Sequence, residues 1–136
     1  MEKLQERTLT IVYQDISLSY NDMLKKSGQL NIRTNLIRLL AIEVYKCVNG
    51  INPKYLNDMF IAPVSNYHFR NQHRLVQPQF KTHKFGYKSF KYFGSKIWNS
   101  LPSHIKSSDN IDIFKKLIYK WCLTDTAIKM LEQLNF

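Results

Sequence analysis

Acidic residues are missing from a long stretch of this 136-residue chain. Residues 59–108, the basic segment, contain no Asp or Glu but hold eight Lys and Arg and all four His. Their formal charge is +8, whereas residues 1–58 and 109–136 sum to +2 and zero. A positive field concentrated in one segment attracts polyanions. The missing carboxylates exclude carboxylate acid–base catalysis within this segment.

Cysteine, glycine and long apolar runs are also scarce. Cys47 and Cys122 are the two cysteines, and both fall on apolar helical patterns, which favours buried free thiols over the alternative of a disulfide. The four glycines are isolated, which excludes a glycine-rich phosphate loop. No run of 18 apolar residues exists, so a membrane span is excluded on length. The charged N-terminus lacks an apolar signal region, so we expect an intracellular protein that is not secreted, in the nucleus or the cytoplasm.

What is present suffices for a core, because 44% of the residues are hydrophobic. We expect a single domain over residues 1–136 with a mainly α fold. Residues 1–58 form its helical part and residues 109–136 its C-terminal helices. Between them, the basic segment is expected to be extended and irregular, with a short β-hairpin as an alternative, and to pack across the helices.

Apolar residues at spacings of three and four predict the helices. The strongest pattern covers residues 34–49 and ends at Gly50, a left-handed stop, after which Asn52 is expected to cap a short helix beginning at Pro53. The residues assigned to the apolar face of this helix are Leu36, Ile37, Leu40, Val44, Cys47 and Val48. Further helices are expected at residues 4–14, between Ser19 and Gly28, from Phe90 to a break at Leu101-Pro102, over residues 111–123 after a cap at Asp109 or Asn110, and from Thr124 or Asp125 onward.

Neither a metal site nor a catalytic group is expected. His68 and His73 are five residues apart, and no cysteine pair has the spacing of a zinc site. Cys47 lies on an apolar face, where a thiolate is disfavoured. Asp109 and Asp112 fit a helix start better than two-metal chemistry. We therefore expect a non-enzymatic protein without cofactor, metal or small-molecule substrate.

The aromatic residues fall into two groups. Phe90, Phe93, Ile97 and Trp98 recur at helical spacing, which favours the core. The stacking candidates stand among cations in irregular sequence and are Tyr67, Phe69, Phe85 and Tyr87. The expected phosphate contacts are Arg70, Arg74, Lys81, Lys84, Lys88 and Lys91. Together they predict a surface for single-stranded RNA or DNA, although a solvated lysine-rich face is the alternative.

Residues 86–102 read GYKSFKYFGSKIWNSLP and are followed by Ile105-Lys106 and by FKKL at residues 114–117. This run resembles the C-terminal region, downstream of the polymerase thumb, of reverse transcriptases from non-LTR retrotransposons (LINEs) of the jockey and chicken-repeat type. Further segments agree in the same order and are RTLTIVY at 7–13, SYNDML at 19–24, AIEVYKCVNG at 41–50, Pro53, Tyr55-Leu56 and Arg70-Asn71.

The resemblance implies a module that holds template RNA or target DNA during target-primed reverse transcription. The family's paired catalytic aspartates, its endonuclease and the Cys/His zinc knuckle of related elements have no counterpart here, so polymerase and nuclease activity do not carry over. Because the match begins near Met1, we expect a detached C-terminal piece. Two alternatives stay open: a module that docks onto a polymerase core, and a truncated retroelement fragment without independent function.

Overall fold

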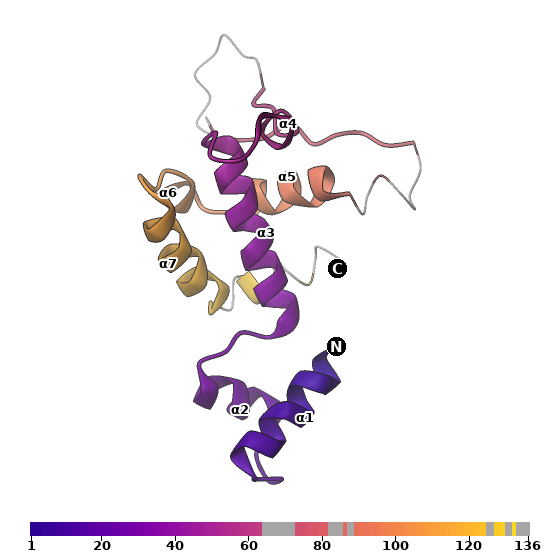
Figure 1. Ribbon diagram of the computed structural model, residues 1–136, viewed down its shortest axis with the longest axis vertical. Helices are drawn as coiled ribbons and strands as arrows, with labels where there is room; N and C mark the ends of the chain where they lie inside the picture. The colour runs from indigo at the N-terminus through magenta and orange to yellow at the C-terminus, as the bar shows by residue number, and fades with distance from the viewer. Residues whose placement is uncertain (64–72, 82–85, 87–88, 125–126, 130–131, 133–136) are drawn as a thin grey trace. The chain divides into compact units, whose positions relative to one another are not determined.

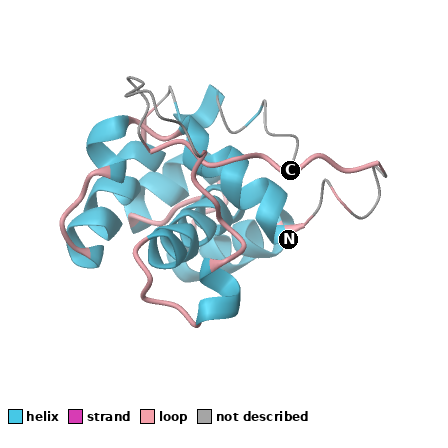
Figure 2. Ribbon diagram, turned by 90° about the horizontal axis from the view of Figure 1, so that it is seen from above, coloured by secondary structure: helices cyan, strands magenta, loops and turns pink. Residues whose placement is uncertain are grey.

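The computed structural model of the chain describes residues 1–63, 73–81, 86, 89–124, 127–129 and 132 (Figure 1). Helix accounts for 64% of it, which confirms the predicted mainly α fold. The described residues form helices and loops without a β-strand (Figure 2). The chain divides into two compact units, the first made of Met1–Leu36 with Cys122–Phe136 and the second of Ile37–Trp121. That residues 1–136 form a single domain stays a prediction.

The first unit contains α1 (Glu2–Tyr13) and α2 (Tyr20–Ser27). The start of α2 follows the predicted capping pattern, because the Ser19 hydroxyl accepts a hydrogen bond from the Asp22 N–H. Gly28 ends the helix at φ 65°, in the left-handed region that glycine adopts without strain. Both ends of this helix were therefore predicted correctly.

A small apolar cluster joins α1 to α2. Leu9, Met23 and Leu24 are buried in it, and half-buried tyrosines pack around them. The Tyr20 hydroxyl donates to Gln5 Oε1 at 2.7 Å, so one polar contact also ties the two helices together. Much of the apolar surface of α1 lies outside this cluster.

Helix α3 (Ile32–Val48) begins two residues before the predicted start. Asn31 causes the difference, because its Oδ1 accepts from the Arg33 N–H at 3.0 Å and so satisfies a free donor of the first turn. At the other end Gly50 has φ 70°, as predicted for a left-handed stop.

The burial of α3 corrects its predicted apolar face. Ile37, Val44 and Cys47 are buried as expected, but Leu36 and Val48 are 46% and 42% exposed. Leu36 lies about 100° around the helix from Ile37, and Val48 lies in the last helical turn. Periodicity gave the direction of the buried face but not its width or its length.

Asn52 was wrongly predicted to cap the next helix. In α4 (Lys54–Asn57), Pro53 occupies the cap position, and no side chain caps the helix. The Asn52 amide instead donates to Glu43 Oε2 at 3.2 Å and to Cys47 Sγ at 3.2 Å, both on α3. Asn52 therefore fastens the turn back onto α3.

Three further helices are described in the second unit, α5 (Phe90–Ser100), α6 (Ser103–Lys106) and α7 (Ile111–Cys122), although Cys122 itself belongs to the first unit. Because α5 and α6 lie within residues 59–108, the basic segment is partly helical and not extended and irregular throughout, as was predicted for it. Of the two residues predicted as the cap of α7, Asn110 is the one used, because its Oδ1 accepts from the N–H groups of Asp112 and Ile113, both at 2.9 Å. The short α6 was not predicted, since one helical turn leaves no periodic signal.

An aromatic stack forms the centre of the second unit. Tyr45 of α3 stacks on Phe114 of α7 with ring centroids 4.3 Å apart, and Trp98 of α5 lies 6.1 Å from Phe114. The ribbon shows α5 crossing α3, with α6 and α7 on its other side (Figure 1). A β-carbon on Gly94 would lie 2.8 Å from side-chain atoms of Phe60 and Val44, so α5 approaches α3 where it has no side chain.

Candidate nucleic-acid interface

Two adjacent side chains of α5, a helix within the basic segment, hold residues 73–75 of the same segment by hydrogen bonds. Trp98 Nε1 donates to the carbonyl oxygen of His73 at 2.7 Å. Asn99 pairs with the backbone of Leu75 in both directions, because its Oδ1 accepts from the Leu75 N–H at 2.8 Å and its Nδ2 donates to the Leu75 carbonyl at 2.9 Å. We call these three hydrogen bonds the α5 clamp. Leu75 itself is 5% exposed, so an apolar contact accompanies them.

Val76 and Phe80 each contact another described residue of the basic segment. The Val76 N–H donates to the carbonyl oxygen of Ile61 at 3.0 Å. Phe80 packs against Gly86 so closely that a β-carbon there would overlap its side chain. Residues 73–81 of the basic segment, where irregular chain or a short β-hairpin was expected, contain neither helix nor strand.

Three of the predicted phosphate contacts belong to the described residues. Arg74 and Lys81 are exposed, and Lys91 is half-buried in the first turn of α5. The other predicted contacts and all stacking candidates lie outside the described residues, so their roles stay predictions; these are Arg70, Lys84, Lys88, Tyr67, Phe69, Phe85 and Tyr87.

The described cations of the basic segment form no salt bridge with a described acid. The salt bridges between described residues are Glu2–Arg33, Glu43–Lys46 and Asp112–Lys115. None of them includes a residue of the basic segment. The described cations of the segment are therefore not paired with a described acid, and their charge is available to an external anion.

Lys106 of α6 is a partly buried cation of the basic segment. Its side chain is half-buried, and burial lowers the pKa of Lys106, with the charge of Arg74 as a smaller contribution in the same direction. Lys106 was counted in the basic segment by sequence but was not assigned to the site.

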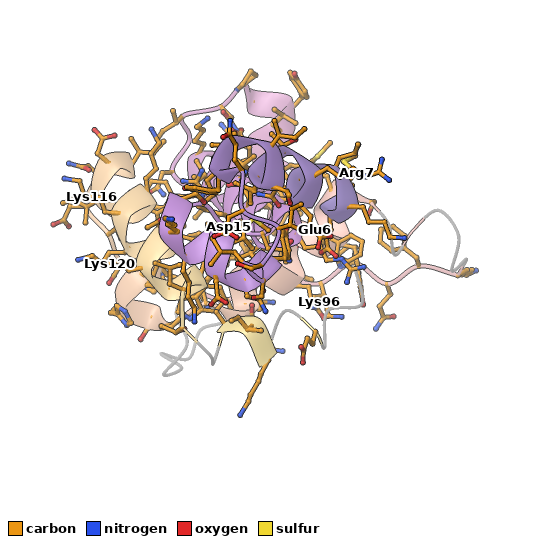
Figure 3. The ribbon with its side chains drawn as sticks, turned by 90° about the horizontal axis from the view of Figure 1, so that it is seen from below. Glu6, Arg7, Asp15, Lys96, Lys116 and Lys120 are labelled. Carbon is orange, nitrogen blue, oxygen red and sulfur yellow. The ribbon has the colours of Figure 1, made fainter. Side chains whose placement is uncertain are left out.

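The cations of α5 and α7 project in different directions. Figure 3 shows Lys116 and Lys120 together on one side of α7, apart from Lys96 of α5. Lys96 Nζ lies 6.0 Å from the centre of the Tyr92 ring, within reach of a cation–π interaction. Lys116 and Lys120 belong to the electrically neutral C-terminal residues 109–136, which makes them suitable controls for the basic segment.

The helical aromatics of α5 are divided between core and margin. Ile97 and Trp98 are buried, so the core assignment is confirmed for them. Phe90 and Phe93 are half-buried, and Phe90 meets Phe60 edge-on with centroids 5.3 Å apart. Packing therefore occupies the faces of α5 that periodicity assigned to the core.

The cysteines and histidines show no arrangement for chemistry in the described chain. Both Cys47 and Cys122 are buried free thiols, as predicted. Burial raises the pKa of the Cys47 thiol, which disfavours the nucleophilic thiolate. His73 and His104 are exposed, and no three described His, Cys, Asp or Glu side chains are grouped to hold a metal ion. No helix among the described residues is long and apolar enough to cross a membrane.

Comparison with known proteins assigns no family. No protein-family model, curated protein or solved structure matches this chain. The resemblance to the reverse-transcriptase C-terminal region therefore stays a prediction carried by the run at residues 86–102. Several residues of that run have structural roles here, because Gly94 permits the approach to α3, and Trp98 with Asn99 forms the α5 clamp.

Sequence reasoning missed the partners that position the cations. Asn99 was read only as part of a motif, yet it fixes the backbone directly after Arg74. Lys106 was not included among the predicted phosphate contacts, because nothing in the sequence near the Leu-Pro break indicates that this lysine is partly buried. One sequence feature could have indicated the role of Asn99: it is a polar residue directly after a tryptophan assigned to the core, within the run 86–102 that carries the family resemblance.

Proposed function

We propose that this chain is a non-catalytic module that binds single-stranded RNA or DNA through its basic segment. The proposal rests on the described cations of residues 59–108, which form no salt bridge with a described acid. Arg74 and Lys81 are exposed, and neither forms an ion pair with a described acid. Phosphate contacts made by such side chains give affinity with little sequence specificity.

The α5 clamp supports the proposal by restricting the backbone that carries Arg74. The carbonyl of His73 and the peptide groups of Leu75 are both hydrogen-bonded to α5, so Arg74 lies between two held residues. Ordering a loop on binding costs free energy, and a backbone that is already held avoids part of that cost. By its resemblance to the reverse-transcriptase C-terminal region, the module would hold template RNA or target DNA beside a polymerase core.

A salt titration tests this function. For single strands, the logarithm of the binding constant falls by about 0.7 per phosphate contact for each tenfold rise in salt. We expect the Arg74→Ala/Lys81→Ala double variant to lower that slope by about 1.4 for two lost contacts. The matched control, Lys116→Ala/Lys120→Ala, removes the same charge from α7 and should leave the slope unchanged.

The same titration with single-stranded RNA, single-stranded DNA and duplex DNA ranks the ligands. Equal slopes for the two double variants would contradict the proposal, because binding would then depend on net charge alone. An affinity for duplex DNA above that for both single strands would contradict the assignment to single strands.

A docking module is the second candidate, favoured by the exposed apolar surface of α1. Leu4, Ile11 and Val12 are 65%, 75% and 66% exposed. Exposed apolar groups of this kind mark contact surfaces in many proteins. Binding to a reverse-transcriptase core that survives nuclease and about half-molar salt would favour docking, since apolar contacts are weakly screened.

The truncated-fragment alternative makes a separate prediction. A fragment without independent function would aggregate through apolar helix faces. In the second unit Val44 of α3 and Phe114 and Ile118 of α7 are fully buried. Cooperative thermal unfolding as a monomer would count against this alternative.

A further inference from the structure

We propose that one base of a single-stranded nucleic acid stacks on the aromatic pair formed by Phe80 and Tyr92, beside Lys96. The inference rests on the proposed function and deepens it, because it names a base-stacking subsite within the basic segment. The stacking candidates chosen from the sequence lie outside the described residues, whereas these three side chains are described and lie next to one another.

The two rings come from different parts of the basic segment. Phe80 belongs to the loop at residues 73–81, and Tyr92 belongs to the first turn of α5. Their ring centroids are 6.4 Å apart and their planes are inclined by 64°, which is an edge-to-face arrangement. Both residues are half-buried, so each keeps surface that a ligand can reach.

A capping serine joins the supports of the two rings. The Ser89 hydroxyl accepts a hydrogen bond from the Tyr92 N–H at 3.3 Å and donates one to the carbonyl of Gly86 at 2.8 Å. Phe80 packs on Gly86, where a β-carbon would overlap its side chain. Both rings are therefore held before a ligand arrives, and a pair that is already placed loses little conformational freedom on binding.

The aromatic stack at the centre of the second unit provides a contrast. Tyr45, Trp98 and Phe114 are at most 2% exposed, so their rings serve the core alone. Phe80 and Tyr92 differ because they are half-buried and lie in the segment that carries the excess positive charge. Accessible aromatic rings among cations are the groups on which the bases of single strands stack.

Lys96 supplies positive charge beside the rings. It follows Tyr92 by four residues on α5, so the two side chains share one helix face. Lys96 Nζ lies 6.0 Å from the centre of the Tyr92 ring. Lys81, directly after Phe80, is exposed, and no salt bridge between described residues includes either lysine. A strand with one base on the rings would bring its phosphates to these lysines.

Two single strands of equal length test the site: an oligothymidylate, and a strand with the same number of phosphates but without bases. We expect the wild type to bind the strand with bases more tightly, because only that strand can stack. The Phe80→Leu/Tyr92→Leu double variant should lower the ratio of the two affinities by about five- to 140-fold, the range for one base stacked on an aromatic side chain. Fluorescence anisotropy at constant salt measures both affinities.

Two further variants separate stacking from other roles of the rings. Tyr92→Phe keeps the ring and should keep the ratio. Tyr55→Leu is the matched control, because Tyr55 of α4 is 68% exposed but lies outside the basic segment, and it should leave the ratio unchanged. An equal fall for Tyr55→Leu would overturn the proposal. So would a double variant that binds both strands more weakly at an unchanged ratio, because the rings would then act in packing alone.

Lys96→Gln tests the charge beside the rings. We expect the salt slope to fall by about 0.7 for both strands, with the ratio of affinities unchanged, because a phosphate contact is lost and the rings remain. Lys116→Gln, on α7, is the control and should leave the slope as it is. An effect of Lys96→Gln no larger than that of Lys116→Gln would overturn the assignment of Lys96 to the site.

The two strands also distinguish the failure of this site from the failure of the proposed function. A wild type that binds both strands equally, with an affinity that falls with salt, would remove the stacking site and leave the function. A wild type that binds neither strand would remove the function, and the site with it. A preference for the strand with bases that depends on the two rings supports both.

Discussion

Asn99→Ala removes both hydrogen bonds that hold the peptide groups of Leu75. Each such bond contributes about 0.5–1.5 kcal/mol net to stability. If the segment then separates from α5, Leu75, now 5% exposed, also loses its burial, which is worth about 1.5–3 kcal/mol for a leucine side chain. We therefore expect the free energy of unfolding to fall by about 1–3 kcal/mol from the two hydrogen bonds alone, and by about 2.5–6 kcal/mol if Leu75 also loses its burial.

Urea unfolding measures this loss, and hydrogen exchange of the Leu75 amide locates it. Ser100→Ala is the control, because the Ser100 hydroxyl donates only to the carbonyl of Ile97 within the same helix, at 2.7 Å. Its effect should stay within about 0.5 kcal/mol. The reasoning would be refuted if Asn99→Ala matched this control and the Leu75 amide kept its protection from exchange.

Three further predictions follow from the helices. Asn110→Ala should cost about 0.5–2 kcal/mol of stability in thermal unfolding, and Asp109→Ala much less, since only Asn110 caps α7; equal losses would contradict this. Gly94→Ala should destabilise the chain by about 1–3 kcal/mol in urea, because the new methyl group meets Phe60 at 2.8 Å; a neutral result would mean that the ring moves freely. The hydrogen bond from its lysine partner lowers the pKa of Glu43, so this pair stabilises the fold above the unfolded pKa and is lost as the pH falls through the folded pKa. Glu43→Gln should remove that acid-range dependence, of less than about 1 kcal/mol for so exposed a pair, and an unaltered pH profile would exclude the pair as its source.

The helices were predictable from sequence because their determinants are local. Ser19 and Gly28 lie next to the helix that they delimit, and apolar spacing marks the buried side of α3. Asn52 was misassigned because a residue before proline fits a cap equally well in sequence. Only the folded chain shows its amide turned toward Glu43 and Cys47 instead.

The candidate site was predictable in its charge but not in its construction. The lack of acids over residues 59–108 is visible by counting. The hydrogen bonds of Asn99 with Leu75 join residues 24 positions apart, and such a pair leaves no periodic pattern. Likewise, the burial that lowers the pKa of Lys106 arises from tertiary packing, which the residues around it in sequence do not reveal.

The forces that hold residues 73–75 on α5 differ from those that would attract the nucleic acid. The α5 clamp consists of hydrogen bonds from neutral side chains to the backbone, and Leu75 adds apolar burial. Such contacts are weakly affected by salt, whereas attraction between exposed cations and phosphates is screened. Raising the salt to about half-molar should therefore release the nucleic acid while the Leu75 amide stays protected from hydrogen exchange. If protection were lost together with binding, residues 73–75 would be held by the ligand and not by α5. The restrained backbone would then no longer explain how Arg74 is positioned.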